Sequence, residues 1–245
     1  MEKQKIETFI KKYSLNGLID QCRWVVKDKT VRVTSMTSDK KFLTNVIMKD
    51  FAVDDVEIGI IDSAKFKQLL GVVGETTTLE VNRDDNNMDT VRSLTISDDK
   101  SEVYLMAADL DVLPPEPKLK TIPSFDVEIK LTEDFVEKFN KSLSATGAEL
   151  FTLVMNKKKQ KLELVFGYGR NNSNRISLPV ECSPDKDTVK NPISFSAKNL
   201  KEVLSANSEN DDPILKISEA GLAVVEYDNK DFQSQYYMIK IEIED

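Results

Sequence analysis

The chain has 245 residues, of which 40% are hydrophobic and 31% charged, with a formal net charge of −8 and no histidine. The absence of histidine excludes Ser-His-Asp and Cys-His catalysis, histidine general bases and histidine-ligated zinc or haem. The length suits one large domain or two of ordinary size, and no apolar run approaches the ~20 residues of a membrane span.

Other residues that carry catalysis are also scarce. Cys22 and Cys182 are the only cysteines, which is typical of reduced thiols in a cytosolic protein, although a disulfide between them stays open. No glycine-rich phosphate loop or dinucleotide-binding glycine motif occurs. The acidic clusters at 84–87 and 210–212 lie between strand-like runs, where such clusters form turns far more often than metal or acid/base sites. We therefore expect no enzymatic activity, no metal and no cofactor.

The first half of the chain predicts two helices among short strands. Apolar residues recur at i, i+3, i+4 and i+7 within residues 6–13, and the same spacing recurs within residues 66–73. Strand-like runs occupy residues 29–37, 55–61, 77–81 and 101–106.

A proline-rich stretch follows these elements near the middle of the chain. Four of the eight prolines fall between Pro114 and Pro123, and residues 109–123 have neither helical nor strand periodicity. Proline removes backbone donors and stiffens the chain, so this stretch predicts an extended connector. It separates an N-terminal domain of residues 1–108 from a C-terminal domain of residues 124–245.

The second half repeats the pattern of the first. Val136, Phe139 and Leu143 have helical spacing, and residues 200–204 give the same spacing one turn shorter. Strand-like runs occupy residues 161–166, 214–217 and 236–242. The lysine run 157–159 is typical of a solvated hairpin turn rather than of a DNA contact.

The four predicted helices are spaced in a way that indicates internal duplication. Their apolar patterns begin at residues 6, 66, 136 and 200, and three of the helices follow a good N-cap in Asp62, Thr132 or Ser196. The strand text Asp-Val-Glu-Ile at 55–58 recurs at 126–129. Chance could produce such spacing, but its coincidence with the connector favours duplication. We predict a strand-rich α+β protein of two similar domains, each with two β-rich half-repeats and one helix per half.

Positive charge is concentrated on the predicted helices of this acidic chain. The four helical segments hold ten lysines and six acidic residues, so the rest of the chain is strongly acidic. Lysines opposite or beside the apolar stripes would form solvated faces suited to non-specific attraction of phosphates. The alternative is that they only keep exposed helix faces soluble. The lysines expected to face DNA are Lys5, Lys11, Lys12, Lys67, Lys138, Lys141, Lys198 and Lys201.

Several short segments resemble one protein family. They are Cys22-Arg23-Trp24, the strand at 33–38, Leu110-Asp111-Val112, Val224-Val225-Glu226-Tyr227, Tyr236-Tyr237 and the acidic ending at 241–245. Together with the half-repeats and the connector, they are similar to DNA polymerase sliding clamps of the proliferating cell nuclear antigen type. Ala107-Ala108-Asp109, the helix-first N-terminus and the short length look more like the T-even phage clamp.

The resemblance implies a DNA-clamp fold, a non-enzymatic role and a ring. The expected ring is a homotrimer closed head to tail through edge strands near 101–106 and 175–182, with helices and their lysines around duplex DNA. Its partners would be DNA, a DNA polymerase and a clamp loader, in the cytoplasm, including a host cytoplasm during phage or viral infection, and with no membrane. The resemblance places the partner-peptide pocket at Met36, Leu110, Val112, Leu113, Tyr237 and Ile239, where ordinary core packing is the alternative.

Two other functions stay open at this stage. A processivity subunit that is not a ring could use the same half-repeats to bind one side of DNA. A β-rich structural or virion protein without a DNA role would use its lysines only for solubility.

Overall fold

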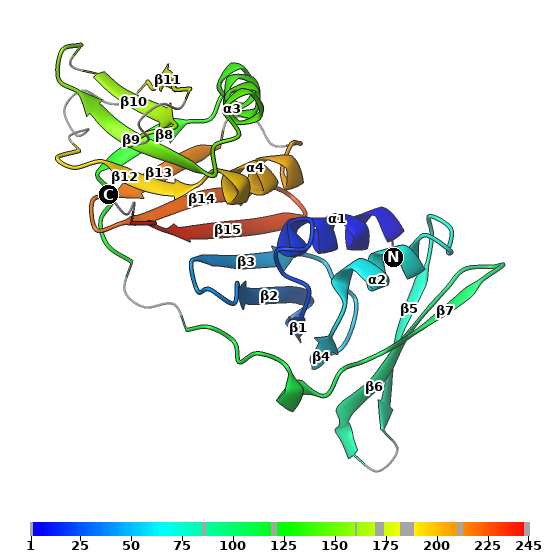
Figure 1. The fold of residues 1–245 in the computed structure, drawn as a ribbon. Helices are drawn as coiled ribbons and strands as arrows, with labels where there is room; N and C mark the ends of the chain where they lie inside the picture. The colour runs from blue at the N-terminus through cyan, green and yellow to red at the C-terminus, as the bar shows by residue number, and fades with distance from the viewer. Residues whose placement is uncertain are drawn as a thin grey trace. The chain divides into compact units, whose positions relative to one another are not determined.

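The computed structural model describes residues 2–84, 87–118, 122–159, 161–169, 174–181, 189–209 and 213–242 (Figure 1). The chain divides into two compact units. Unit 1 comprises residues 1–38, 43–118 and 228–234, and unit 2 comprises residues 39–42, 119–227 and 235–245. The domain limits expected from the sequence stay a prediction.

Unit 1 combines two helices with seven strands among its described residues. Its elements are α1 (Lys3–Ser14), β1 (Cys22–Lys27), β2 (Thr30–Met36), β3 (Phe42–Met48), β4 (Val56–Ile60), α2 (Ser63–Leu70), β5 (Thr78–Asp84), β6 (Asn87–Ser97), β7 (Glu102–Met106) and the 3-10 turn η1 (Leu110–Val112). The strands pair antiparallel in the orders β4-β1-β2-β3 and β5-β6-β7. In Figure 1, α1 and α2 lie side by side on one face of the first of these rows.

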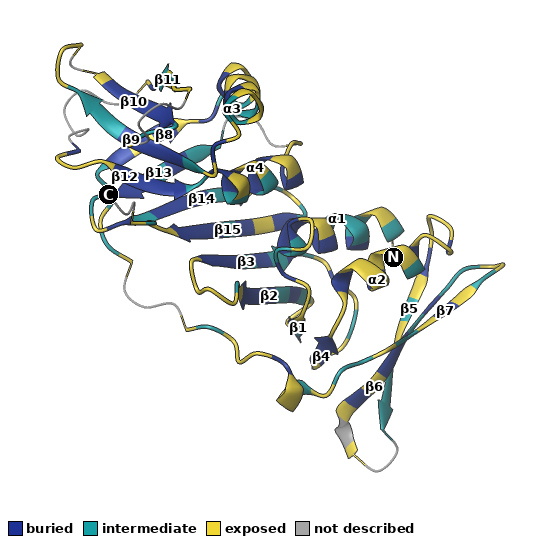
Figure 2. Cartoon of the chain, in the orientation of Figure 1, coloured by how far each residue is buried: buried dark blue, intermediate teal, exposed yellow. Residues whose placement is uncertain are grey.

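Aromatic side chains hold both helices on that face. Alternate residues of β1 are buried, which places Trp24 in the core. Its ring lies 5.3 Å from that of Phe9 in α1 and 5.4 Å from that of Phe66 in α2. The buried side of both helices and of the strands beneath them is visible in Figure 2. One tryptophan therefore fixes both helices of the unit on the sheet.

Unit 2 likewise combines two helices with antiparallel strands among its described residues. Its elements are β8 (Val127–Lys130), α3 (Glu133–Thr146), β9 (Leu150–Asn156), β10 (Lys161–Phe166), β11 (Ile176–Pro179), β12 (Ile193–Ser196), α4 (Ala197–Ala206), β13 (Ile214–Ser218), β14 (Leu222–Asp228) and β15 (Phe232–Ile239), the last beginning in unit 1. The strand orders are β11-β10-β9-β12 and β15-β14-β13-β8. Phe139 of α3 is fully buried between Phe151 and Phe166, at ring distances of 5.9 and 5.2 Å.

The order of elements repeats along the chain. The series β4-α2-β5-β6-β7 recurs as β8-α3-β9-β10-β11 and again as β12-α4-β13-β14-β15. The shorter series α1-β1-β2-β3 precedes these three, and an isolated bridge between Glu2 and Thr76 lies just before its helix. The repeated Asp-Val-Glu-Ile text supplies β4 and β8, which occupy the same place in their copies. The predicted α+β fold with one helix per β-rich half-repeat is confirmed.

The predicted helix starts are correct in detail. The side chains of Asp62, Thr132 and Ser196 each accept a hydrogen bond from the backbone N–H three residues later, at 2.7, 3.3 and 3.2 Å. Each cap satisfies one of the N–H groups that have no partner within the helix. The lysine run 157–159 forms the turn between β9 and β10, as predicted.

Two expectations of local structure are wrong. The buried face of α3 is formed by Phe135, Phe139 and Ser142, whereas Val136 and Leu143 are half-buried. The larger Phe135 ring stacks with Phe139 and takes the place assigned to Val136. The described part of the connector is also not wholly extended, since Asp109 accepts a hydrogen bond from the Asp111 N–H at 2.9 Å and starts η1.

Candidate functional site

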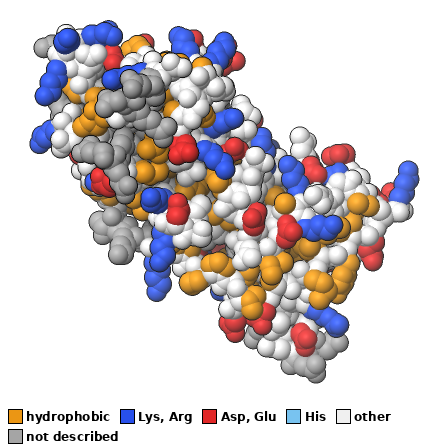
Figure 3. Space-filling view, in the orientation of Figure 1, with side chains coloured by type: hydrophobic (Ala, Val, Ile, Leu, Met, Phe, Trp, Pro, Cys, Tyr) orange, Lys and Arg blue, Asp and Glu red, His pale blue; other side chains and the backbone are white. Residues whose placement is uncertain are grey.

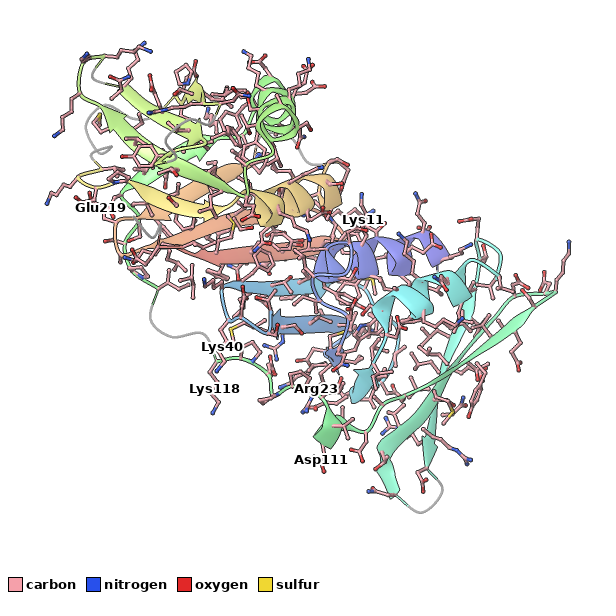
Figure 4. The ribbon with its side chains drawn as sticks, in the orientation of Figure 1. Lys11, Arg23, Lys40, Asp111, Lys118 and Glu219 are labelled. Carbon is pink, nitrogen blue, oxygen red and sulfur yellow. The ribbon has the colours of Figure 1, made fainter. Side chains whose placement is uncertain are left out.

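The exposed lysines of α1 and α2 form the basic surface of unit 1. Lys11 and Lys67 are both exposed, and each lies in the last turn of its helix, where a positive charge interacts favourably with the helix dipole. Figure 4 shows Lys11 on the side of α1 away from the strands. Neither side chain forms an ion pair within the part of the chain that the structure describes. Both ammonium groups are therefore available to an anion in solvent.

Lys12 was expected on the solvated face, and this expectation is wrong. Its side chain is fully buried, and its Nζ lies 5.4 Å from the ring centroid of Phe232. Phe232 follows Lys12 by more than two hundred residues, so the spacing of apolar residues within the helix could not reveal this cover. The aromatic ring supplies a cation–π contact to the buried ammonium group.

Lys5 is also largely withdrawn from solvent. Its Nζ lies 2.9 Å from Asp231, and only 17% of its side chain is exposed. Residues 228–234 therefore cover one flank of α1 and neutralise one of its charges. The basic surface of α1 is narrower than the sequence predicts.

In unit 2, α3 and α4 differ in how their lysines are compensated. Lys138 pairs with Asp134 at 2.6 Å, and Lys141 pairs with Glu137, one helical turn earlier in each case. The hydrogen bond from Lys141 to Glu137 raises the pKa of that lysine. Lys198 and Lys201 of α4 are exposed and form no ion pair with any described residue. Of the eight expected lysines, Lys11, Lys67, Lys198 and Lys201 are those that no acidic side chain of the described residues compensates.

Two features of the described residues bear on catalysis, their potential metal ligands and their thiol chemistry. They contain no cluster of three or more cysteine, aspartate or glutamate side chains placed to hold a metal ion. Burial raises the pKa of the Cys22 thiol to about 12, so the thiolate that a nucleophile requires is scarce at neutral pH. Cys182 lies outside the described residues, as does the predicted acidic turn at 210–212. No described helix is long and apolar enough to cross a bilayer.

The expected partner-peptide residues are divided between the units. Unit 1 holds Met36, at the end of β2, and the three connector residues Leu110, Val112 and Leu113. Unit 2 holds the other two. Met36 and Val112 are exposed, with 36% and 65% of their surface accessible, and Leu113 is buried. Tyr237 is buried and Ile239 is 47% exposed. Each unit therefore exposes apolar surface among these residues. That the six residues form one pocket stays a prediction.

The start of the connector is fastened to the face of the β4-β1-β2-β3 row opposite the helices. Ala108 donates a backbone hydrogen bond of 2.9 Å to the Gly59 carbonyl, at the free edge of β4. A Cβ on Gly59 would collide with the Ala108 carbonyl and meet a Leu113 methyl at 3.1 Å. Arg23 of β1 donates to the Leu110 carbonyl at 3.0 Å. Gly59 was not among the residues expected at the site, although a glycine inside a strand can mark such a close backbone approach.

The two strands expected at subunit contacts are the outermost strands of their sheets. In β7, Tyr104 and Met106 are exposed, whereas Val103 is buried and Leu105 is half-buried, so apolar side chains line one face of the edge strand. Figure 3 shows hydrophobic side chains at the surface of this part of unit 1. β11 pairs only with β10 among the described residues, and the Cys182 end of the expected segment lies outside them.

Comparison with known proteins identifies the fold. No family model matches the chain, and no curated protein matches its sequence. Among solved structures, the chain is similar to the proliferating cellular nuclear antigen of Entamoeba histolytica, with a TM-score of 0.70 over 98% of this chain and 96% of that chain, at 16% identity. The chain therefore has the sliding-clamp fold that the sequence resemblance predicts.

Proposed function

We propose that the chain is a subunit of a ring-shaped sliding clamp, which encircles duplex DNA and tethers a DNA polymerase to its template. The main support is the likeness to a solved clamp over nearly the whole length of both chains. In this proposal the protein has no catalytic role. It acts in the compartment where DNA is copied, which we place in the cytoplasm, including that of an infected host.

The contact with DNA would be made by lysines on the helices. The uncompensated lysines occur in both units, on α1, α2 and α4. These three helices, all of whose residues the structure describes, carry no exposed aromatic side chain. Such a surface attracts phosphates without reading bases, which is what a protein that slides requires. The acidic remainder of the chain would repel the duplex from the outer surface.

Ring closure would use the two outermost strands. An edge strand presents unpaired N–H and C=O groups, and natural proteins rarely leave a long one uncovered. We propose that β7 of one subunit pairs with β11 of the next. A head-to-tail contact of this kind closes into a ring when the rotation from one subunit to the next is a whole fraction of a full turn. For the proposed trimer, this rotation is one third of a turn. Tyr104 and Met106 would be buried at that contact.

Two measurements test the ring. Light scattering at micromolar concentration should give three times the chain mass of 27.7 kDa. Protein threaded on a linear duplex whose ends are then blocked with streptavidin should stay bound in 1 M salt and be released when a nuclease cuts the duplex. A topological link does not depend on ionic strength, whereas a phosphate contact does.

The alternatives give other results. A processivity subunit that binds one side of DNA would have the mass of a monomer or dimer and would be released by salt from the blocked duplex. A structural protein would not stimulate polymerase on a long primed template at any concentration. The proposal includes a clamp loader and a DNA polymerase as partners. Stimulation of that polymerase on a primed template, in the presence of the loader, tests the role of both.

A further inference from the structure

One of the contacts that hold the connector comes from Arg23, a side chain within strand β1. Arg23 lies in the middle of the β4-β1-β2 part of its sheet, paired across from Gly59, and its side chain points away from the Trp24 core. Nη2 donates to the Leu110 carbonyl at 3.0 Å, and Nη1 donates to a Glu57 carboxylate oxygen at 3.1 Å. The guanidinium fork therefore joins β1, β4 and the connector.

The carbonyl that Arg23 binds begins η1. Leu110 O also accepts the N–H of Leu113, at 3.3 Å, so one oxygen connects the anchor to the turn. Leu113 is buried against Gly59, whereas Val112 faces solvent. Figure 4 shows Arg23 and Asp111 at this end of the connector. Arg23 thus bonds to the turn in which Val112 is exposed and Leu113 is buried.

The chemistry of the contact suits positioning better than simple stabilisation. Arg23 Nε is buried without a hydrogen-bond partner among the described residues, which is an unfavourable arrangement for a residue that only supports the sheet. A planar guanidinium that bridges a carboxylate and a carbonyl has a fixed direction, which a flexible lysine ammonium does not. The side chain is 26% exposed, so water only partly screens these bonds.

We infer that Arg23 is a positioning residue for the partner-peptide site, holding the turn Leu110–Leu113 in the conformation that a peptide binds. The inference rests on the proposed clamp function for the identity of its ligand, a short peptide with apolar anchors. The apparent affinity for a peptide rises with the fraction of the protein that already has the binding conformation. Loss of the Arg23 bond would lower that fraction.

The first test measures the anchor without any partner. Backbone amide exchange at Ala108, Val112 and Leu113 is compared in the wild type, Arg23→Gln and Arg23→Lys. Loss of one bond from a charged donor should speed exchange at Val112 and Leu113 about tenfold in Arg23→Gln, with Arg23→Lys intermediate. Wild-type exchange rates in both variants would overturn the anchorage. Arg23→Lys also keeps the charge beside Glu57 and serves if Arg23→Gln folds poorly.

Arg32 provides a matched control on the same face. It pairs with Glu116 further along the connector at 3.0 Å, but both side chains are substantially exposed. Exposed ion pairs contribute little, so Arg32→Gln should change exchange at Val112 and Leu113 by less than about twofold. An effect equal to that of Arg23→Gln would mean that any lost connector contact loosens the turn, and would refute a special role for Arg23.

The second test uses polymerase stimulation on a long primed template. In Arg23→Gln, the clamp concentration that gives half-maximal stimulation should rise about tenfold while the maximal rate stays unchanged. Faster amide exchange with an unchanged half-maximal concentration would refute a role at the partner site. Absence of stimulation by the wild type would refute the clamp function and that role together, whereas the exchange experiment would still decide the anchorage.

Discussion

The difference between α3 and α4 allows a direct test of which lysines meet DNA. The variants Lys198→Ala/Lys201→Ala and Lys138→Ala/Lys141→Ala each remove two positive charges per subunit, so their effects on net charge are identical. In the described part of the chain, the second pair is bonded to acidic residues on its own helix and the first pair is not. A lysine already paired releases fewer counterions when it meets a phosphate, and removing it leaves Asp134 and Glu137 behind.

The expected magnitude follows from counterion release. Each phosphate neutralised by a lysine contributes about 0.9 to the slope of log K against log salt concentration. If one of the two α4 lysines contacts DNA at a time, a trimer loses three contacts and the slope falls by about 2.7. Between 50 and 200 mM salt, wild-type affinity should therefore fall about 40-fold further than that of the α4 variant.

Fluorescence anisotropy of a labelled duplex, titrated at several salt concentrations, gives this slope directly. We expect the α3 variant to change it by less than about 1. Equal changes in both variants would show that only net charge matters. An unchanged slope in the α4 variant would refute the assignment of Lys198 and Lys201 to the DNA-facing surface.

Three further changes have definite outcomes. Leu113→Glu should abolish polymerase stimulation while light scattering still reports the wild-type mass, because a charge at this buried connector position disturbs the peptide site and not the edge strands. Lys12→Met should leave the salt slope unchanged within about 0.3, because the fully buried Lys12 cannot reach a phosphate; a fall of 1 or more would contradict its burial. Backbone N–H groups of Gly74 and Lys100 and the Ser101 hydroxyl hold the pKa of Asp98 well below its usual range. Its contribution to stability is therefore present above the unfolded pKa of about 3.9 and is lost as pH falls through the lower folded pKa. Asp98→Asn should lower the melting temperature at pH 7, with the difference narrowing below about pH 4; a constant difference down to pH 2 would contradict this account.

Local rules explain most of what the sequence predicted well. A cap such as Ser196 and the turn at 157–159 depend on residues a few positions apart, so their spacing carries the information. The apolar spacing of α4 is correct, since Leu200, Val203 and Leu204 are all buried. The repeated text at 55–58 and 126–129 located two equivalent strands.

Long-range contacts explain what the sequence did not show. Phe232 covers Lys12, and Asp231 neutralises Lys5, from a segment that no local pattern connects with α1. In the sequence, Arg23 belongs to a segment that resembles the clamp family, and no local pattern indicates its bond to Leu110. That bond depends on where the connector crosses the sheet. Side-chain pairing within α3 could have been anticipated, since Asp134 and Lys138 stand four residues apart.

The contribution of residues 228–234 to unit 1 has a consequence for the order of folding. Lys49 bonds to Asp228 at 2.7 Å, and the flank of α1 is closed by the two residues Asp231 and Phe232. During synthesis these partners emerge long after α1, so the N-terminal half leaves the ribosome with the Lys12 side of its first helix uncovered. We expect a fragment that stops at the connector to lack this cover, so that producing the two halves as separate pieces requires adding residues 228–234 to the first.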